Sequence, residues 1–314
     1  ARVVNDGAAA LLLALNSMGN RKEVLISRGE LVQIGGGFRI PDILRKSGAK
    51  RREVGTTNIT TIADYEGGIT PGQTGLILKV HKSNFIQAGF TEEVPLRELV
   101  ALGQREGIAV MNDLGSGVFV DTKEILGYTE PTVQQSVRTG AEITSFSGDK
   151  LLGGVQAGLI VGKAEYVARI KKNPLFRTMR VDKIMFSMLE QLFSIYLGGT
   201  WRTDIKLWRI LSLHEAELYK RGKKIVAEVG SPAGVSVEAT DAYVGGGALP
   251  ESAIPSVGIF FSKNFNANTL LRRFRERELP VIGRIENDRF VLDLKAVDEE
   301  DVGALTESIR AVLT

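Results

Sequence analysis

The sequence predicts an α/β fold, with a mostly parallel central sheet flanked by helices and a smaller α+β domain at its C-terminal end. Two observations predict it. Over the first two-thirds of the chain, short apolar runs alternate with helical patterns, as in a sheet built from β-α-β units. From about Lys183 to Val229 the pattern becomes helical, and beyond it strand and helix patterns alternate in a shorter stretch.

The first predicted helix, Ala8 to Met18, has capping residues in front of it and the stop signal Gly19-Asn20 behind it. A second helical segment runs from Pro95 to Glu106. The strands of this region are predicted from short apolar runs of the kind that is buried on both faces of a parallel sheet. These runs are Val24–Ile26, Leu76–Val80, Ile108–Met111, Ile143–Phe146 and Gly158–Val161.

The change of pattern after Lys183, with the break at Leu197–Thr200, predicts a domain boundary. We assign residues 1–200 to a large domain and residues 201–314 to a linking helix and a small α+β domain. The small domain is predicted from two strands and two helices, at 256–262, 268–277, 290–294 and 299–313.

Composition excludes several classes of protein. With 43% apolar and 25% charged residues, the 314-residue chain is of an ordinary globular kind, and no apolar run approaches the roughly 18 residues of a membrane span. The absence of cysteine excludes disulfides, thiolate metal sites and a cysteine nucleophile. The two histidines lie far apart and predict no metal site. The N-terminus lacks the order of a secretory signal, so we expect a cytoplasmic protein.

The most informative segment is a glycine-rich turn, Thr144–Gly154, that begins on a predicted buried strand. It carries Lys150, which is placed for Schiff-base chemistry because a partly desolvated lysine amine is more readily neutral and nucleophilic. Ser147, three residues earlier, could reach a phosphate group. An isolated S-x-x-K is more often a surface turn, so this segment alone leaves that interpretation open.

A carboxylate stands at the end of a neighbouring predicted strand. Asp113 follows the apolar run 108–111, and open α/β sheets bind ligands at the carboxyl ends of their strands. An anion in this place would keep the pyridine nitrogen of pyridoxal phosphate (PLP) protonated. An aspartate close to glycine is also common as a cap or turn residue.

Two further features are compatible with the same cofactor. Asn5, Asp6 and Gly7 form a strand-to-helix junction whose free N–H groups and helix dipole suit a phosphate, although every capped helix begins in a similar way. His81 follows the strand that ends at Val80 and could stack on the cofactor ring, although a lone histidine is more often structural.

Together these features appear in the order expected of fold type I PLP-dependent enzymes, and the sequence closely resembles the bacterial selenocysteine synthases, or L-seryl-tRNA(Sec) selenium transferases. The resemblance covers nearly the whole chain and rests on the blocks Ser27–Val32, Gly36–Pro41, Glu53–Asn58, Asp113–Gly117, Ser147–Gly154, Arg180–Lys183, Gly283–Glu286 and Phe290–Lys295. The family begins well upstream of Ala1. We therefore expect an N-terminal tRNA-binding domain and the first part of the catalytic domain to be missing.

The resemblance implies roles for the strand-end residues. Lys150 would hold PLP as an internal aldimine and act as a catalytic residue together with its neighbour Asp149. Asp113 would pair with the pyridine nitrogen, and His81 would lie against the ring. Residues 1–200 would then be the PLP-binding catalytic domain, incomplete at its N-terminus.

Three arginines are assigned to anionic parts of the substrates. Arg177 and Arg180 match family arginines that help to hold the selenium donor, and guanidinium groups suit tetrahedral oxyanions. Without the resemblance, a solvated basic turn is the preferred interpretation of this pair. Arg284 is the candidate partner of the substrate α-carboxyl group, with an ordinary surface turn as the alternative.

The implied reaction converts seryl-tRNA(Sec) to selenocysteinyl-tRNA(Sec) with selenophosphate, through β-elimination to dehydroalanyl-tRNA and addition of selenium. The family assembles as a decamer, a pentamer of dimers, so we expect a homo-oligomer, smaller if the chain is truncated. The net charge of +3 is too small to argue for a polyanionic partner by itself. Basic segments that could meet tRNA phosphates, or be solvated faces, are Arg45–Lys46, Lys50–Arg52, Lys220–Lys224 and Arg272–Arg277.

Two alternatives remain open. Relatives of these synthases include PLP-dependent ammonia-lyases that act on phosphorylated amino sugar acids, and the pair Arg177 and Arg180 would serve such a substrate too. The other alternative is an inactive truncated fragment that keeps the fold, binds little PLP and remains a monomer or dimer.

Overall fold

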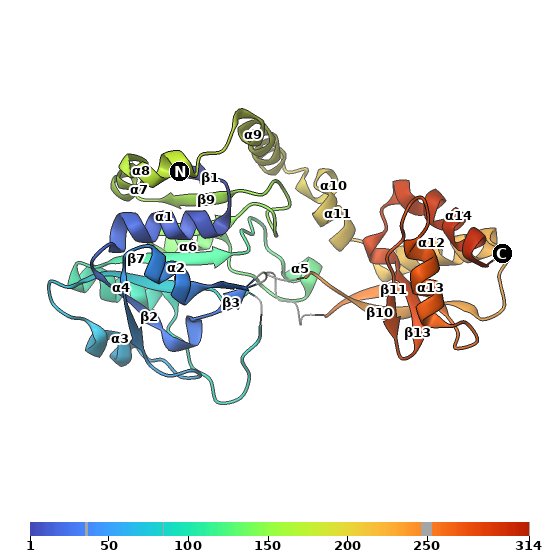
Figure 1. The fold of residues 1–314 in the computed structure, drawn as a ribbon, viewed down its shortest axis with the longest axis horizontal. Helices are drawn as coiled ribbons and strands as arrows, with labels where there is room; N and C mark the ends of the chain where they lie inside the picture. Colours follow the sequence, from blue (N-terminus) through green and yellow to red (C-terminus); the bar gives the residue numbers. More distant parts are fainter. Residues whose placement is uncertain (35–36, 84, 246–252, 314) are drawn as a thin grey trace. The chain divides into compact units, whose positions relative to one another are not determined.

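The structure is a computed structural model that describes residues 1–34, 37–83, 85–245 and 253–313 (Figure 1). The chain divides into two compact units, the first consisting mainly of Ala1–Gly199 and the second of Thr200–Tyr243 with residues 253–313. None of the helices in the described part of the chain has the length and hydropathy of a membrane span.

The first unit alternates strands and helices along the chain. Its strands are β1 (Arg2–Val4), β2 (Glu23–Ser27), β3 (Gln33–Ile34), β4 (Phe38–Arg39), β5 (Lys50–Val54), β6 (Thr74–Val80), β7 (Ala109–Gly115), β8 (Ile143–Ser147) and β9 (Gly158–Gly162). Its helices are α1 (Gly7–Gly19), α2 (Ile40–Lys46), α3 (Ile62–Gly68), α4 (Leu96–Glu106), α5 (Lys123–Leu126), α6 (Val133–Thr139), α7 (Ala164–Lys172), α8 (Pro174–Thr178) and α9 (Lys183–Gly198).

Seven of these strands form one sheet in the order β1-β9-β8-β7-β6-β2-β5. The pairs from β8 through β5 are all parallel, whereas β9 runs antiparallel to both β1 and β8. The predicted α/β fold with a mostly parallel central sheet is therefore confirmed. Because β6, β7 and β8 are parallel neighbours, the residues that follow them emerge at one edge of the sheet.

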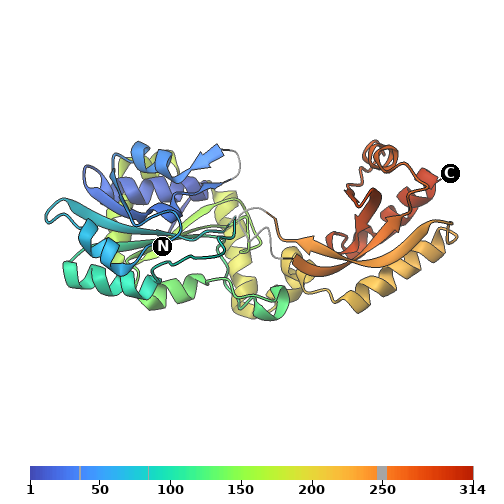
Figure 2. The ribbon, with the colours of Figure 1, turned by 90° about the horizontal axis from the view of Figure 1, so that it is seen from below.

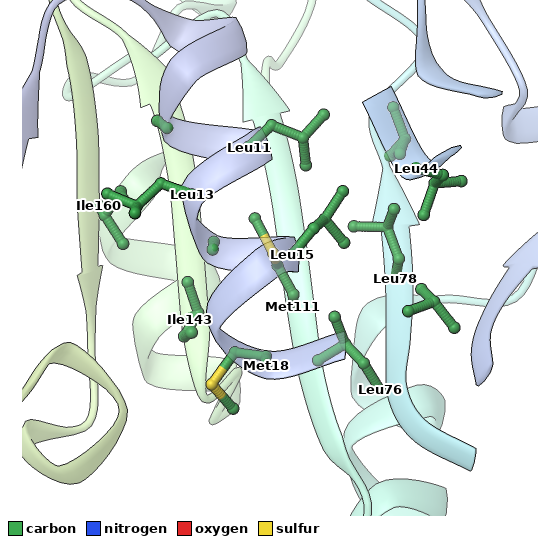
Figure 3. Close-up of a cluster of buried hydrophobic side chains, with 14 of the residues drawn as sticks. Leu11, Leu13, Leu15, Met18, Leu44, Leu76, Leu78, Met111, Ile143 and Ile160 are labelled. Atoms are coloured by element: carbon green, nitrogen blue, oxygen red, sulfur yellow. The ribbon is translucent and has the colours of Figure 1, made fainter. Parts of the chain in front are cut away.

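Both faces of the sheet are covered. Side chains alternate between the two faces along each strand, and the buried strands carry apolar residues on both sides, so both faces need a hydrophobic cover. On one face α1 packs Leu11, Leu13 and Leu15 against a cluster that includes Leu76 and Leu78 of β6 (Figure 3). On the other face Ile77 of β6 belongs to a second cluster formed with α3 and α4. Helix α1, which begins beside the strand ends, is thus held firmly by its apolar side chains.

The basic segment Lys50–Arg52 lies on a strand that the sequence did not predict. It forms most of β5, an edge strand whose Val54 is buried while Lys50, Arg51 and Arg52 are exposed. Charged residues on an edge strand hinder pairing with another chain. The strand could not be recognised in the sequence because four of its five residues are charged and only Val54, at its end, is apolar.

The second unit is an antiparallel sheet with helices. Its elements are α10 (Trp201–Asp204), α11 (Lys206–Leu211), α12 (Glu215–Glu228), β10 (Val235–Tyr243), β11 (Ala253–Phe261), α13 (Ala267–Arg275), β12 (Arg284–Glu286), β13 (Arg289–Asp293) and α14 (Val302–Leu313). The strand order is β10-β11-β13-β12, and β10 and β11 pair over their whole length (Figure 2). Side chains of α12, α13 and α14 share one core with the sheet, in which the rings of Phe274 and Phe290 stack 5.1 Å apart.

The predicted elements of this unit agree with the structure to within a few residues. The final helix begins at Val302 rather than Glu299, because Glu299–Asp301 forms a 3₁₀ turn capped by the side chain of Asp298. Strand β10 was not predicted, since Val235–Tyr243 mixes small, polar and charged residues and lies only partly buried.

Candidate active site

His81, Asp113 and the turn that carries Lys150 come from the ends of three neighbouring strands, at the carboxyl edge of the sheet. Val80 at the end of β6 pairs with Asp113 of β7, and Asp113 pairs with Ser145 of β8. His81 follows directly, and its backbone N–H donates a 2.9 Å hydrogen bond to the carbonyl of Asp113. The strand register therefore brings His81 and Asp113 together and places the turn after β8 beside them.

Asp113 is a carboxylate whose surroundings disfavour its charge. Burial raises the pKa of Asp113 to about 6, although a hydrogen bond from Ser145 and the charges of Lys150 and His81 act in the opposite direction. Ser145 Oγ donates that bond to Oδ1 at 2.8 Å. A carboxylate of this kind gains from a cationic partner that can reach its remaining lone pairs.

Lys150 lies in the turn between β8 and β9, and its Nζ atom reaches back over the end of β7. A Cβ atom added to Gly115 would lie 3.8 Å from Nζ, and the φ angle of +66° at Gly115 is one that glycine adopts without strain. The turn is held by a hydrogen bond from Leu151 N to the carbonyl of Ser116 and by one from Gly153 N to Lys150 O. Lys150 is partly buried.

Asp149, the neighbour of Lys150, is exposed. Within the described residues no carboxylate forms an ion pair with Lys150, so its amine stays available to a ligand. No group of three or more His, Asp or Glu side chains that could hold a metal ion occurs in the described part of the chain.

The beginning of α1 lies against the end of β8. The Asp6 side chain caps α1 by accepting a 2.8 Å hydrogen bond from Ala9 N, which leaves the N–H groups of Gly7 and Ala8 without a partner inside the helix. A Cβ atom on Gly7 would lie 2.3 Å from Ser147 Oγ, so only glycine fits there without a shift. The structure thus brings the predicted phosphate residues Asp6, Gly7 and Ser147 together.

The segment that carries Arg177 and Arg180, although far away in sequence, is joined to the same junction by a backbone hydrogen bond. Asn5, in the junction, donates a 3.0 Å backbone hydrogen bond to the carbonyl of Met179, which stands between the two arginines in sequence. Both arginines are exposed, and in the described ranges neither guanidinium pairs with a carboxylate. The backbone between the two arginines is thus joined to the start of α1, and no ion pair among the described residues occupies their guanidinium groups.

Arg284 lies on β12 in the second unit. Its guanidinium contacts Asp293 Oδ2 at 2.7 Å, Thr240 Oγ1 at 2.7 Å and Glu286 Oε2 at 3.3 Å. These contacts fix the side chain within its own sheet. Its assignment to the substrate α-carboxyl group stays a prediction.

Two buried carboxylates at this edge were missed by sequence reasoning. Glu30 accepts hydrogen bonds from Val80 N at 2.8 Å and from Lys79 Nζ at 2.9 Å, and so holds the end of β6 in place. Glu130 lies 2.8 Å from the imidazole of His81. Glu30 belongs to the block Ser27–Val32 and could have been suspected there, whereas nothing near Glu130 in the sequence marks it.

A parallel sheet that gathers a lysine, an aspartate and a histidine at its carboxyl edge, beside a glycine-containing helix start, has the architecture of the fold type I PLP-dependent enzymes. A family model described as "SelA: L-seryl-tRNA selenium transferase" matches residues 1–298, and the chain belongs to this family. The resemblance seen in the sequence is therefore confirmed.

Individual members of this family are similar to the chain over its whole length. The L-seryl-tRNA(Sec) selenium transferase of Geotalea daltonii is 44% identical over 319 residues, which cover 100% of this chain and 69% of the relative. That of Aquifex aeolicus is 43% identical, with 99% and 70% covered. The chain thus spans about 69% of the length of the first relative.

One solved structure shows the same fold at low sequence identity. A D-glucosaminate-6-phosphate ammonia-lyase superposes with a TM-score of 0.69 and 18% identity, over 99% of this chain and 80% of the other. This likeness supports the fold only.

Proposed function

We propose that this chain is an L-seryl-tRNA(Sec) selenium transferase that uses PLP to convert seryl-tRNA(Sec) to selenocysteinyl-tRNA(Sec) with selenophosphate. The observation that carries the proposal is the convergence of Lys150, Asp113 and His81 at one edge of the sheet, in a chain that is 44% identical to such a transferase. The transferases are the relatives that share this level of identity, so their reaction is preferred over that of the ammonia-lyase.

The residues present fit PLP in charge and in chemistry. The free N–H groups of Gly7 and Ala8, with Asn5, Asp6 and the Ser147 hydroxyl around them, would hold the phosphate at the positive end of α1. Asp113, whose pKa is raised by burial, would gain a partner in the protonated pyridine nitrogen. When bound, PLP supplies an electron sink for charge that develops at the α-carbon of an amino acid.

Each side chain at the site would then have its own role in the reaction. Lys150 would bind the cofactor through Nζ and, when released, move the proton at the substrate α-carbon, since an amine free of ion pairs can act as a base. Asp113 would keep the pyridine nitrogen protonated, and His81 would lie against the ring. Asp149, exposed beside Lys150, would assist proton movement at the open side of the site.

The selenium donor is assigned to Arg177 and Arg180. A phosphate-like donor carries several negative oxygens, and two guanidinium groups that pair with no carboxylate of the described residues can bind them in forked hydrogen bonds. The backbone hydrogen bond from Asn5 to the Met179 carbonyl supports an anion site near the proposed phosphate site, because it joins the segment of the two arginines to the start of α1.

Two further parts of the proposal follow from the family, and a third from the fold. We expect a homo-oligomer, which light scattering of the purified chain would measure, and a cytoplasmic location, where charged tRNA is handled. Arg284 is proposed as the partner of the substrate α-carboxyl group, which is an ester in seryl-tRNA and would accept a hydrogen bond through its carbonyl oxygen. The ion pairs of Arg284 with Asp293 and Glu286 would hold the guanidinium in a fixed direction.

The proposal is tested by incubating the PLP-loaded chain with seryl-tRNA(Sec) and selenophosphate and by measuring selenocysteine released from the tRNA. Wild type is expected to form it, Lys150→Ala to form none, and Arg97→Ala, a substitution on the exposed side of α4, to match wild type. Ammonia release from a phosphorylated amino sugar acid, with no selenocysteine formed, would contradict the proposal and favour the lyase.

A further inference from the structure

Glu130 is a fully buried carboxylate with one partner. Its residue exposure is 0%, and Oε2 lies 2.8 Å from Nε2 of His81. Among the described residues nothing pairs with Oε1, which is also buried. A buried carboxylate with so little compensation is costly, so its single contact with His81 must be retained for the carboxylate to be tolerated.

A short, tightly bonded loop brings Glu130 to this position. The backbone N–H of Glu130 donates a 2.9 Å hydrogen bond to Thr122 Oγ1, and the same hydroxyl donates at 2.7 Å to the carbonyl of Tyr128. Thr122 is itself fully buried. Val133 N bonds to the carbonyl of Val118 at 3.1 Å and closes the loop. The carboxylate is therefore held by a fixed backbone rather than by a flexible surface chain.

His81 is consequently anchored at two points. Its backbone N–H is bound to the carbonyl of Asp113 on β7, and its ring is bound to Glu130 from the loop before α6. An imidazole has one nitrogen that donates and one that accepts when it is neutral, and its partner decides which. A carboxylate can only accept while it is ionised, so it selects a proton on Nε2.

We propose that Glu130 is a positioning residue, which fixes the orientation of the His81 ring and the proton on its Nε2 atom, so that the ring stands ready to lie against the cofactor. The contact itself is independent of PLP. Its meaning for the reaction rests on the proposed function, in which His81 faces the ring.

The first test is nuclear magnetic resonance of the cofactor-free protein labelled with ¹⁵N at histidine. The chain contains only His81 and His214, and His214 is exposed, so it serves as an internal reference. Wild type is expected to show one imidazole N–H proton that exchanges slowly with water, on Nε2 of His81. A wild-type spectrum in which His81 carries its proton on Nδ1, or shows no protected proton, would overturn the proposal without any variant.

Variants then assign the effect to Glu130. Glu130→Leu should lose the protected proton, whereas Glu130→Gln should keep it because the amide oxygen still accepts a hydrogen bond. Glu142→Leu is the matched control: Glu142 is also buried but lies before β8, at the opposite end of that strand, where it pairs with Lys163. Loss of the proton in Glu142→Leu, or its survival in Glu130→Leu, would contradict a specific role of Glu130.

The second readout is the dissociation constant of PLP, measured by titration. We expect Glu130→Leu to raise it about tenfold, Glu130→Gln to raise it less, and Glu142→Leu to leave it as in wild type. Equal PLP affinity in wild type and Glu130→Leu would overturn the positioning role. If wild type binds no PLP at all, the proposed function fails, and the spectrum of His81 still decides whether Glu130 fixes the ring.

Discussion

Ser145 Oγ donates a 2.8 Å hydrogen bond to Asp113 Oδ1 between two paired positions of β7 and β8. This bond is the one side-chain hydrogen bond that supports the Asp113 carboxylate among the described residues. Burial outweighs it and raises the pKa of Asp113 to about 6. The carboxylate of Asp113, near the end of β7, therefore has too few partners to stabilise its negative charge, and a cationic ligand would supply one.

Asp113→Asn should stabilise the cofactor-free chain at high pH. Because the native pKa lies above the ordinary value of 3.8, the unfolded state loses its proton first, and wild-type stability falls as pH rises from about 4 to about 6. The variant avoids this loss and should be more stable by about 1–3 kcal/mol at pH 8, with a difference near zero below pH 4. Urea unfolding at pH 4, 6 and 8 measures the effect.

The control for that experiment is Asp149→Asn, since Asp149 is exposed on the same side of the sheet. It should change stability by less than about 0.5 kcal/mol at each pH. An Asp113→Asn difference that is equal at pH 4 and pH 8 would show that burial does not raise the pKa of Asp113.

Gly158→Ala should disturb the junction that begins α1. A Cβ atom at Gly158 would lie 1.9 Å from the carbonyl oxygen of Asp6, a backbone atom that can move only with the helix start. We expect a loss of about 1–3 kcal/mol in stability together with weaker PLP binding. Thermal unfolding and PLP titration provide the two measurements.

Gly67→Ala is its matched control, because Gly67 is exposed within α3 and has open space around its Cα. It should stabilise the chain by about 0.5–1 kcal/mol. Unchanged PLP affinity in Gly158→Ala would mean that the helix start does not bind the phosphate.

Arg177→Ala and Arg180→Ala should each raise the KM for selenophosphate about tenfold or more, since each removes charge-assisted hydrogen bonds to an oxyanion. The dissociation constant of PLP should change little. Lysine at either position should restore only part of the affinity, because an ammonium group cannot form the two-pronged contact. Steady-state kinetics at several selenophosphate concentrations tests this, with Arg97→Ala as the surface control; an unchanged KM in both variants would exclude the assignment.

Phe290→Ala should destabilise the second unit by about 3–5 kcal/mol, because Phe290 is fully buried and stacks on Phe274. Both tryptophans of the chain, Trp201 and Trp208, lie in this unit, so tryptophan fluorescence follows its unfolding. Leu279→Ala, at a side chain that is 58% exposed, should shift the transition by less than about 0.5 kcal/mol. Equal shifts for the two variants would contradict the core described for this unit.

The fold and the positions of His81, Asp113 and Lys150 at one edge of the sheet could be predicted because their signals are local. Each buried strand of the parallel sheet is a short apolar run. The residues that follow it, such as His81 directly after β6 and Lys150 in the turn after β8, reach the ligand edge by topology alone. Strand β5 gave no such signal, because an edge strand needs few apolar residues.

Glu130 could not be predicted from the sequence for a different reason. It meets His81 across 49 positions of the chain, from a loop whose shape depends on hydrogen bonds of the buried Thr122. No periodic pattern encodes such a contact. For Arg284, a residue type and a turn could be read from the sequence, but its partners Asp293 and Thr240 could not, because they come from two other strands.

An absorbance titration of the chain with PLP shows whether Lys150 holds the cofactor. It compares wild type with Lys150→Ala and with Lys163→Ala, a control at a lysine that is paired to Glu142. Wild type and Lys163→Ala are expected to develop the band of PLP joined to a lysine amine, at roughly 420 nm, and Lys150→Ala to develop none. A band that persists in Lys150→Ala, or that is absent from all three proteins, would contradict the assignment of Lys150 as the residue that holds the cofactor.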